Sequence, residues 1–156
     1  MINMLKGILF LLFILSAEIV FAQDADKDFS LGLRAGDPTG LTLKKYLGTN
    51  ALELTIGSLL GDGDLSIFVH YLFHNPITSI GDNNDITGLD WYYGLGGQIK
   101  SFNGAVDLGG DGVLGLEYTF SEIPITVFLD AILYVEIIDN PLNIDLDAGI
   151  GARYNF

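Results

Sequence analysis

Two histidines and one serine are the residues of this chain whose types and spacing could support hydrolytic chemistry. Ser66, His70 and His74 follow one another at intervals of four. A serine hydrolase needs a histidine within hydrogen-bond reach of the serine hydroxyl, and a metal site needs several ligands around one point. In an extended chain, residues four apart lie about 13 Å from each other. The spacing therefore favours structural histidines, and a lipid-modifying enzyme is less favoured than a non-enzymatic barrel.

Acidic, glycine-rich stretches invite a calcium interpretation at two places, Gly61–Asp64 and Asp107–Gly112. Neither matches the ligand spacing of a helix–loop–helix calcium site, and Asp-Gly pairs are typical of hairpin turns. The sequence also contains no cysteine, which excludes a thiol nucleophile. We therefore predict no metal, no cofactor and no catalytic residue. The net charge of −13 argues against nucleic-acid binding.

The last thirteen residues indicate the element type that positions these side chains. From Ile144 to Phe156, apolar residues occupy the even positions, whereas Asp, Gly, Arg and Asn occupy the odd ones. Successive side chains of a strand point to opposite faces, so this segment has one apolar and one polar face. A strand of this kind that closes on an aromatic residue is typical of the final strand of a bacterial outer-membrane β-barrel.

The same alternation recurs along the chain. It predicts strands over Phe29–Gly36, Leu41–Leu47, Ala51–Ser58, Leu65–His74, Leu89–Lys100, Val113–Phe120, Ile125–Ile138 and the C-terminal segment. The short connections on one side are expected at Asp37–Gly40, Gly61–Asp64, Ser101–Gly112 and Asp139–Asn143. We predict an all-β fold, an eight-stranded antiparallel up-and-down transmembrane barrel.

Residues 1–22 have the layout of a secretory signal: one lysine, an apolar run and a small-residue exit at Val20-Phe21-Ala22. We expect cleavage before Gln23. The apolar run is shorter than the roughly 20 residues that a spanning helix requires. Residues 23–156 then form one domain, and about 17 residues are available for each strand and its turn. The expected location is the outer membrane of a Gram-negative bacterium.

The polar parity of the predicted strands carries most of the charges and many glycines. An eight-stranded barrel is just wide enough to be filled by side chains, and buried charges must be paired. We therefore predict a lumenal polar network centred on Arg34 and Arg153. Its members are Arg34, Glu53, His70, Glu117, Asp130, Asp147 and Arg153, and Lys44, Asp90, Glu136 and Asp145 share the inward parity.

Aromatic residues gather at one end of the predicted strands. If both termini face the periplasm, this end is the periplasmic one, and the aromatics form the girdle expected at a membrane interface. The predicted girdle consists of Phe29, Tyr71, Phe73, Trp91, Tyr93, Tyr118, Phe120, Tyr154 and Phe156. Most of them share the apolar parity; Tyr46 lies near the same end on the other face.

Several segments resemble the small outer-membrane β-barrel domain family of Gram-negative bacteria. They read LGLRAGDPTGLTLKKYL, LDWYYGLGG, GVLGLEYTFSEIPITVFLDA and GIGARYNF. The resemblance covers most of residues 23–156 and implies the barrel fold, the outer membrane and recognition by the barrel-assembly machinery. It carries over no catalytic residues, because the family has no agreed activity.

We interpret the chain as a non-enzymatic, monomeric barrel in outer-membrane lipid, with a largely filled polar lumen and a structural or membrane-organising role. A narrow pore or small-ligand carrier is the alternative, and the short connections disfavour a surface adhesin. A soluble lipocalin-like barrel with an apolar interior is the alternative fold. The long connection Asn75–Gly88 is unexpected, because this layout puts it on the periplasmic side, where turns are short.

The terminal aromatic gives a first testable prediction. Deletion of Phe156, or Phe156→Asp, should lower the yield of assembled barrel, because the resemblance implies that the assembly machinery reads a terminal aromatic. Heat-modifiable migration on a gel measures the assembled fraction. Unchanged migration and yield would contradict the prediction.

Overall fold

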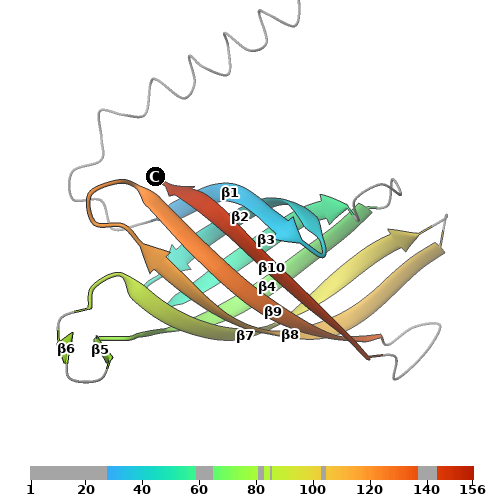
Figure 1. The fold of residues 1–156 in the computed structure, drawn as a ribbon. Helices are drawn as coiled ribbons and strands as arrows, with labels where there is room; N and C mark the ends of the chain where they lie inside the picture. The colour runs from blue at the N-terminus through green and yellow to red at the C-terminus, as the bar shows by residue number, and fades with distance from the viewer. Residues whose placement is uncertain (1–27, 59–64, 81–82, 85, 103–104, 137–143) are drawn as a thin grey trace, which may run out of the picture.

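The structure, a computed structural model, describes residues 28–58, 65–80, 83–84, 86–102, 105–136 and 144–156. Eight antiparallel strands form one closed barrel (Figure 1). These strands are β1 (Phe29–Gly36), β2 (Thr39–Leu47), β3 (Asn50–Ser58), β4 (Leu65–Pro76), β7 (Leu89–Phe102), β8 (Ala105–Thr119), β9 (Ile125–Glu136) and β10 (Ile144–Asn155). The expected signal segment and the expected turns at 61–64 and 139–143 lie outside the described residues.

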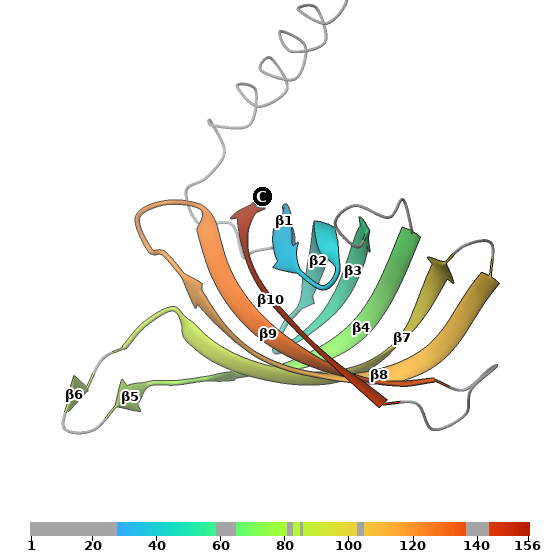
Figure 2. The ribbon, with the colours of Figure 1, turned by 45° about the vertical axis from the view of Figure 1, so that its right-hand side comes forward.

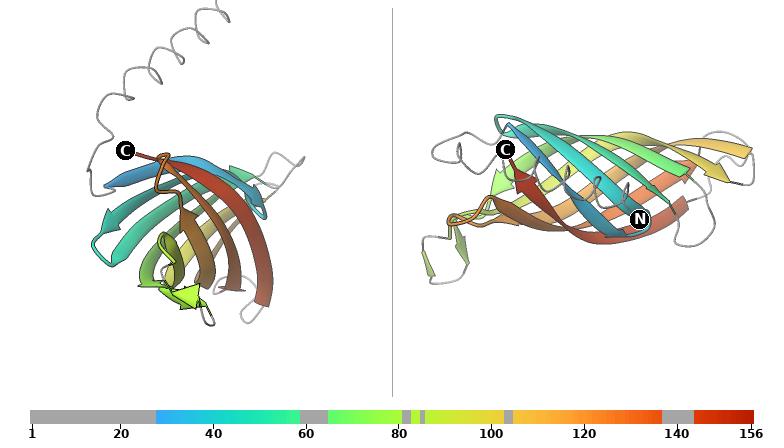
Figure 3. Two further views of the ribbon diagram at one scale, coloured as in Figure 1. Left: turned by 60° about the vertical axis from the view of Figure 1, so that its left-hand side comes forward. Right: turned by 90° about the horizontal axis from the view of Figure 1, so that it is seen from above.

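The barrel closes where the first strand meets the last. Leu33 of β1 lies opposite Leu41 of β2 on one side and Ala152 of β10 on the other. The remaining strands pair in chain order, β4 pairing directly with β7. Figure 3 shows the strands tilted around a common interior. The predicted eight-stranded antiparallel barrel is confirmed. In the part of the chain that the structure describes, there is no helix long and apolar enough to cross a membrane.

One predicted connection is wrong. Ser101–Gly112 was expected between strands, but β7 continues to Phe102 and β8 begins at Ala105. The glycines of Gly109-Gly110-Asp111-Gly112 suggested a turn, yet period-two alternation continues through them. Val106 and Leu108 are exposed, whereas Gly109 and Asp111 are buried. Glycine weakens a strand without forbidding it, and paired neighbours on both sides hold this segment extended.

The long connection between β4 and β7 contains a small hairpin of its own. β4 runs two residues beyond the predicted end, to Pro76. Then β5 (Ser79–Ile80) pairs with β6 (Asn83–Asn84) in a separate two-stranded sheet. Figures 1 and 2 show this hairpin projecting beyond the ends of the barrel strands. It lies at the end of the barrel where β1 begins and β10 ends, which we name the terminal mouth; the opposite end is the distal mouth.

The barrel has a polar interior and an apolar exterior. Buried inward positions carry Arg, Lys, Glu, Asp, His, Ser and Thr. Large aliphatic side chains are exposed on the outside of the wall, among them Leu31, Leu33, Leu41, Leu52, Ile56, Leu65, Val69, Leu95, Ile99, Leu114, Leu129, Leu133 and Ile150. This polarity rules out the lipocalin-like alternative, which requires an apolar interior.

An apolar cluster lies among the polar side chains of the interior. Cross-strand register places Ala51 next to Leu72 on one side of the wall and Val113 next to Ile132 on the other. Together with Tyr92, these side chains form a buried cluster. The cluster interrupts the polar lining, so the interior is packed by aliphatic and aromatic groups as well as by charges.

Close packing around Tyr92 gives a second prediction. A Cβ added at Gly115 would lie 2.3 Å from Tyr92 Cζ, and the Tyr92 ring is fully buried. Gly115→Ala should therefore lower the free energy of unfolding by about 1–3 kcal/mol, the usual cost of overpacking. Urea unfolding in detergent measures it.

Gly112→Ala on the same strand is the matched control. The nearest atom to its added Cβ is 3.9 Å away, which leaves ordinary room. Equal stability of the two variants would show that strand propensity, rather than the packing of Tyr92, decides the effect.

Candidate functional site

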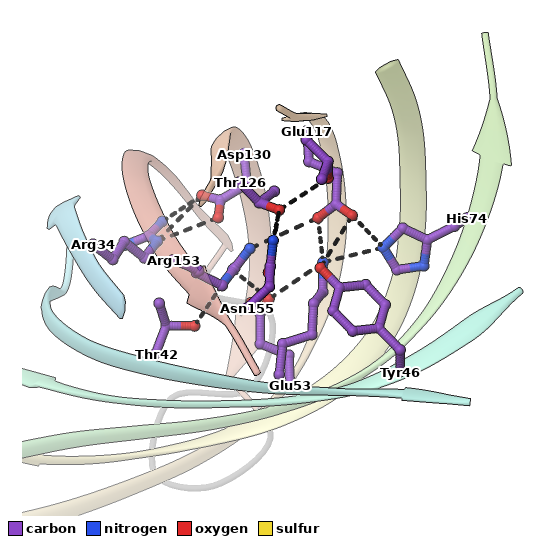
Figure 4. Close-up of polar contacts among 12 residues, drawn as sticks. Arg34, Thr42, Tyr46, Glu53, His74, Glu117, Thr126, Asp130, Arg153 and Asn155 are labelled. Atoms are coloured by element: carbon purple, nitrogen blue, oxygen red, sulfur yellow. Dashed lines mark hydrogen bonds and ion pairs between the residues drawn. The ribbon is translucent and has the colours of Figure 1, made fainter. Parts of the chain in front are cut away.

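Four charged side chains of alternating sign form a closed ring inside the barrel, here named the charged ring: Lys44, Glu117, Arg153 and Glu53. Lys44 Nζ lies 2.6 Å from Glu117 Oε2 and 3.8 Å from Glu53 Oε2. Arg153 Nη2 lies 2.5 Å from Glu53 Oε2, and its Nη1 lies 3.8 Å from Glu117 Oε2. None of the four is more than 3% exposed. Figure 4 shows Glu53, Glu117 and Arg153 of this ring with their polar contacts.

Strand register brings the ring together. Lys44 of β2 is the cross-strand partner of Glu53 of β3, and their side chains face the same interior. Arg153 of β10 lies opposite Gly32 of β1. Because Gly32 has no side chain, the guanidinium extends over β1, and its Nε donates to Thr42 Oγ1 at 3.3 Å. Glu117 comes from β8, on the far side of the wall.

Aromatic and hydroxyl groups line the charged ring. The Arg153 guanidinium lies 3.6 Å from the Phe128 ring centroid, and Lys44 Nζ lies 4.5 Å from that of Tyr92. Tyr46 donates its hydroxyl to Glu117 Oε1 at 3.4 Å. Stacking over an aromatic face stabilises a desolvated cation. The ring therefore offsets the cost of burial by opposite charges, hydrogen bonds and aromatic faces together.

A second ion pair lies beside the charged ring. Arg34 Nη2 donates to Asp130 Oδ1 at 2.7 Å, its Nε donates to the same carboxylate at 3.2 Å, and its Nη1 donates to the carbonyl oxygen of Pro38 at 2.7 Å. Gly149 makes room, since a Cβ there would lie 2.4 Å from Arg34 Cζ. This two-point geometry is one that lysine cannot reproduce.

The distal half of the interior holds a smaller polar group. His70 Nε2 and Asp111 Oδ1 lie 3.1 Å apart, and both side chains are buried. They meet across Gly96, where an added Cβ would lie 2.4 Å from the His70 ring. Lys100 Nζ lies 3.4 Å from Asp147 Oδ2 near the distal mouth. The amide atoms of Gln98 and the hydroxyl of Tyr134 are buried without a hydrogen-bond partner among the described residues.

The structure distributes the predicted lumenal residues over four contacts. Glu53, Glu117 and Arg153 meet in the charged ring, and Arg34 meets Asp130. His70 and Asp147 instead face Asp111 and Lys100. All seven predicted residues are buried. Asp145, expected on the inward face, is exposed at the distal end of β10.

Sequence reasoning did not include several members of this interior among the site residues. Lys44 appears there only as one inward charge, yet it contacts both glutamates of the charged ring. Asp111 was assigned to a connection, although its parity within an extended strand would have placed it inside. Tyr46 was treated as an exception to the girdle; its hydroxyl in fact bonds Glu117.

The predicted aromatic girdle lies on the outside of the wall near the terminal mouth. Phe73 stacks on Tyr93 with ring centroids 5.3 Å apart, and Trp91 stacks on Tyr93 at 5.6 Å. Separate edge-to-face pairs join Tyr71 to Phe73, Tyr118 to Phe120 and Tyr154 to Phe156. Phe29 lies under the ammonium of Lys45, 4.3 Å from its ring centroid.

The three residues considered for hydrolytic chemistry, Ser66, His70 and His74, do not come together in one site. Ser66 lies opposite Lys100 in the register, four residues and about 13 Å along β4 from His70. His70 faces Asp111, and His74 lies 3.5 Å from Glu117 Oε1. Within the described ranges, no group of three or more His, Asp or Glu side chains is placed to hold a metal ion.

The Arg34 pair gives a third prediction. Arg34→Ala leaves Asp130 buried and unpaired, which should cost about 3–5 kcal/mol of unfolding free energy if water stays out of the interior. Lys100→Ala is the control, because its pair is longer and partly exposed, and its loss should cost below about 1 kcal/mol. Urea unfolding in detergent measures both. An Arg34→Ala effect below about 1 kcal/mol would reject the filled interior and favour a wet channel.

The barrel resembles a solved structure, the N-terminal β-barrel domain of Pseudomonas aeruginosa OprF. The two share 15% sequence identity at a TM-score of 0.63, and the match covers 82% of this chain and 95% of that one. No protein-family model matches the sequence, and no curated protein matches it. The chain is thus similar in fold to that β-barrel domain.

Proposed function

We propose that this protein is an integral outer-membrane barrel with a side-chain-filled lumen and a non-enzymatic, structural or membrane-organising role. The exterior supports membrane insertion. Leu95 is 72% exposed and Leu146 is 73% exposed, and they belong to an apolar surface that continues around the wall. Soluble monomers rarely expose contiguous apolar patches beyond a few hundred Å². A hydrocarbon environment makes the same surface favourable.

The charged ring is the observation that carries the filled-lumen proposal. Three of its members come from β2, β3 and β10, which lie near one another around β1, and Glu117 comes from β8 on the opposite side of the barrel. An ion passing along the axis would have to separate pairs that lie as close as 2.5 Å. Removing one partner from a buried pair costs about 3–5 kcal/mol. The ring therefore acts as a structural tie across the lumen.

Location, biogenesis and partners follow from the same proposal. Residues 1–22 serve as the export signal, and the terminal aromatic strand is recognised by the barrel-assembly machinery. Outer-membrane lipid is the main partner of the folded chain, which works as a monomer. The OprF domain, an outer-membrane-type barrel by its fold, supports this location by analogy. The −13 net charge gives nucleic acid no favourable surface.

A narrow pore or small-ligand carrier is the second candidate, and one observation favours it. Both amide atoms of Gln98, the hydroxyl of Tyr134 and Oδ2 of Asp111 are buried without a hydrogen-bond partner among the described residues, although Oδ1 of Asp111 faces His70. Buried polar groups of this kind are commonly satisfied by internal water. If water fills the distal half of the interior and also passes the charged ring to the terminal mouth, the lumen forms a narrow pore.

Reconstitution in lipid tests this proposal in two steps, our fourth prediction. The refolded protein should float with lipid vesicles and resist carbonate extraction, because its exterior is apolar. In planar bilayers it should show no steady single-channel conductance, because the charged ring closes the lumen. Glu117→Gln, which weakens the ring without changing its size, should raise the frequency of brief openings.

Each outcome decides one part of the proposal. Protein that stays in the aqueous fraction would overturn the membrane location. Steady conductance of the unmodified protein would overturn the filled lumen and establish the pore. Absence of openings in Glu117→Gln would show that the ring is not the element that closes the lumen.

A further inference from the structure

One lysine breaks the pattern of the otherwise uncharged outer face of the wall. Successive residues of a strand point to opposite faces. In the eight described barrel strands, every Asp, Glu, Arg and Lys other than Lys45 has the inward parity. Lys45 has the outward parity of Leu43 and Leu47 on β2, and it is exposed as they are. Its position is therefore a feature that the packing of the lumen does not explain.

The level of Lys45 on the wall is that of a membrane interface. A lysine on the lipid face destabilises a barrel at the middle of the bilayer and is tolerated near its surface, where the side chain extends to the polar head groups. Lys45 lies two residues before the end of β2, at the terminal mouth. The aromatic girdle lies at the same end of the barrel. The ammonium therefore lies within reach of lipid head groups.

Strand register sets Lys45 in a row that crosses four strands. Its cross-strand partners are Phe29 of β1 and Leu52 of β3, and Tyr71 of β4 is the next partner of Leu52. All four side chains are exposed. Lys45 Nζ lies 4.3 Å from the Phe29 ring centroid, and this aromatic face steadies the ammonium beside the wall.

A hydrogen-bonded pair lies at the other end of this row. Asn50 Nδ2 donates to the Tyr71 hydroxyl at 3.0 Å on the exposed surface. An amide carries two N–H donors and a phenol one, so the pair keeps two donor hydrogens whichever way the amide is turned. Tyr71 is two strands from Lys45, or about 10 Å along the sheet. A glycerophosphate head group can cover this span.

We propose that the outer face of β1–β4 at the terminal mouth binds the head group of an anionic phospholipid. The Lys45 ammonium contacts the phosphate, and the Asn50–Tyr71 pair donates to a second head-group oxygen. The acyl chains lie over Leu31 and Leu43, which are the next outward residues toward the middle of the wall. A zwitterionic head group fits less well, because it brings a second positive charge close to Lys45. This inference rests on the proposed membrane insertion.

Phosphatidylglycerol and phosphatidylcholine with the same acyl chains are the matched probes, because they differ in the net charge of the head group. The protein is refolded into vesicles that contain equal amounts of both lipids, floated and extracted in mild detergent. Native mass spectrometry then counts the retained lipids. Phosphatidylglycerol should be retained about fivefold over phosphatidylcholine, the value of one lysine near an anionic surface. Lys45→Gln should remove this preference, which is the fifth prediction.

Controls separate the site from general electrostatics. Lys100→Gln makes the same charge change at an inward side chain near the distal mouth and should leave the preference unchanged. Lys45→Arg keeps the charge and should keep the preference. Asn50→Ala should lower retention of both lipids by about threefold, because it removes donors of the pair.

The flotation step distinguishes failure of this site from failure of the proposed function. Unmodified protein that does not float would overturn the membrane location. Protein that floats but retains both lipids equally would overturn the lipid site alone, as would equal loss of preference in Lys45→Gln and Lys100→Gln. Unchanged retention in Asn50→Ala would overturn the contact with the Asn50–Tyr71 pair.

Discussion

The interior of an eight-stranded barrel is barely wider than the side chains that point into it, and this constraint governs the whole structure. Every inward position must be filled, and every filled position must satisfy its polar atoms without bulk water. Here large groups therefore alternate with glycine. Arg34 occupies the space that Gly149 leaves, and Tyr92 occupies that of Gly115. The charged ring is the electrostatic counterpart of this packing, since each of its cations has carboxylates on two sides.

The register between neighbouring strands decides which side chains face the interior. In a two-residue period, a slip by one position would turn every charge toward the outside. Lys44, Glu53 and His70 are consecutive cross-strand partners, so a slip would break the ring as well as expose it. The polar interior thus specifies pairing that the apolar exterior alone would not, because leucine at several exterior positions would pack equally well against lipid or detergent.

Sequence reasoning recovers most of the wall and only part of the interior. The alternation of apolar and polar residues predicts seven of the eight strands with ends within a few residues of the observed ones. It does so because each strand has one face toward the interior and one toward the outside. The prediction was wrong for the start of β8. There Gly109-Gly110-Asp111-Gly112 has the residue types of a turn but keeps the inward and outward alternation of a strand. Inward parity identified Arg34 and Asp130, but no local pattern says that residues 96 positions apart will pair. That information lies in strand order and shear, which a single sequence does not reveal.

The wall of this barrel is uneven in height. β10 pairs with β1 only from Gly149 onward, and Asp37 N–H reaches the Ala148 carbonyl, so no described strand flanks the β1 side of β10 before that point. Exterior apolar residues run from Val106 to Tyr118 on β8, or about 28 Å of height at a 45° tilt, but from Phe29 to Ala35 on β1, or about 14 Å. Exposed backbone amides do not tolerate hydrocarbon. If this barrel spans a bilayer, as proposed, the bilayer must thin on the β1 side or the barrel must lean, and either response would bend the leaflet locally.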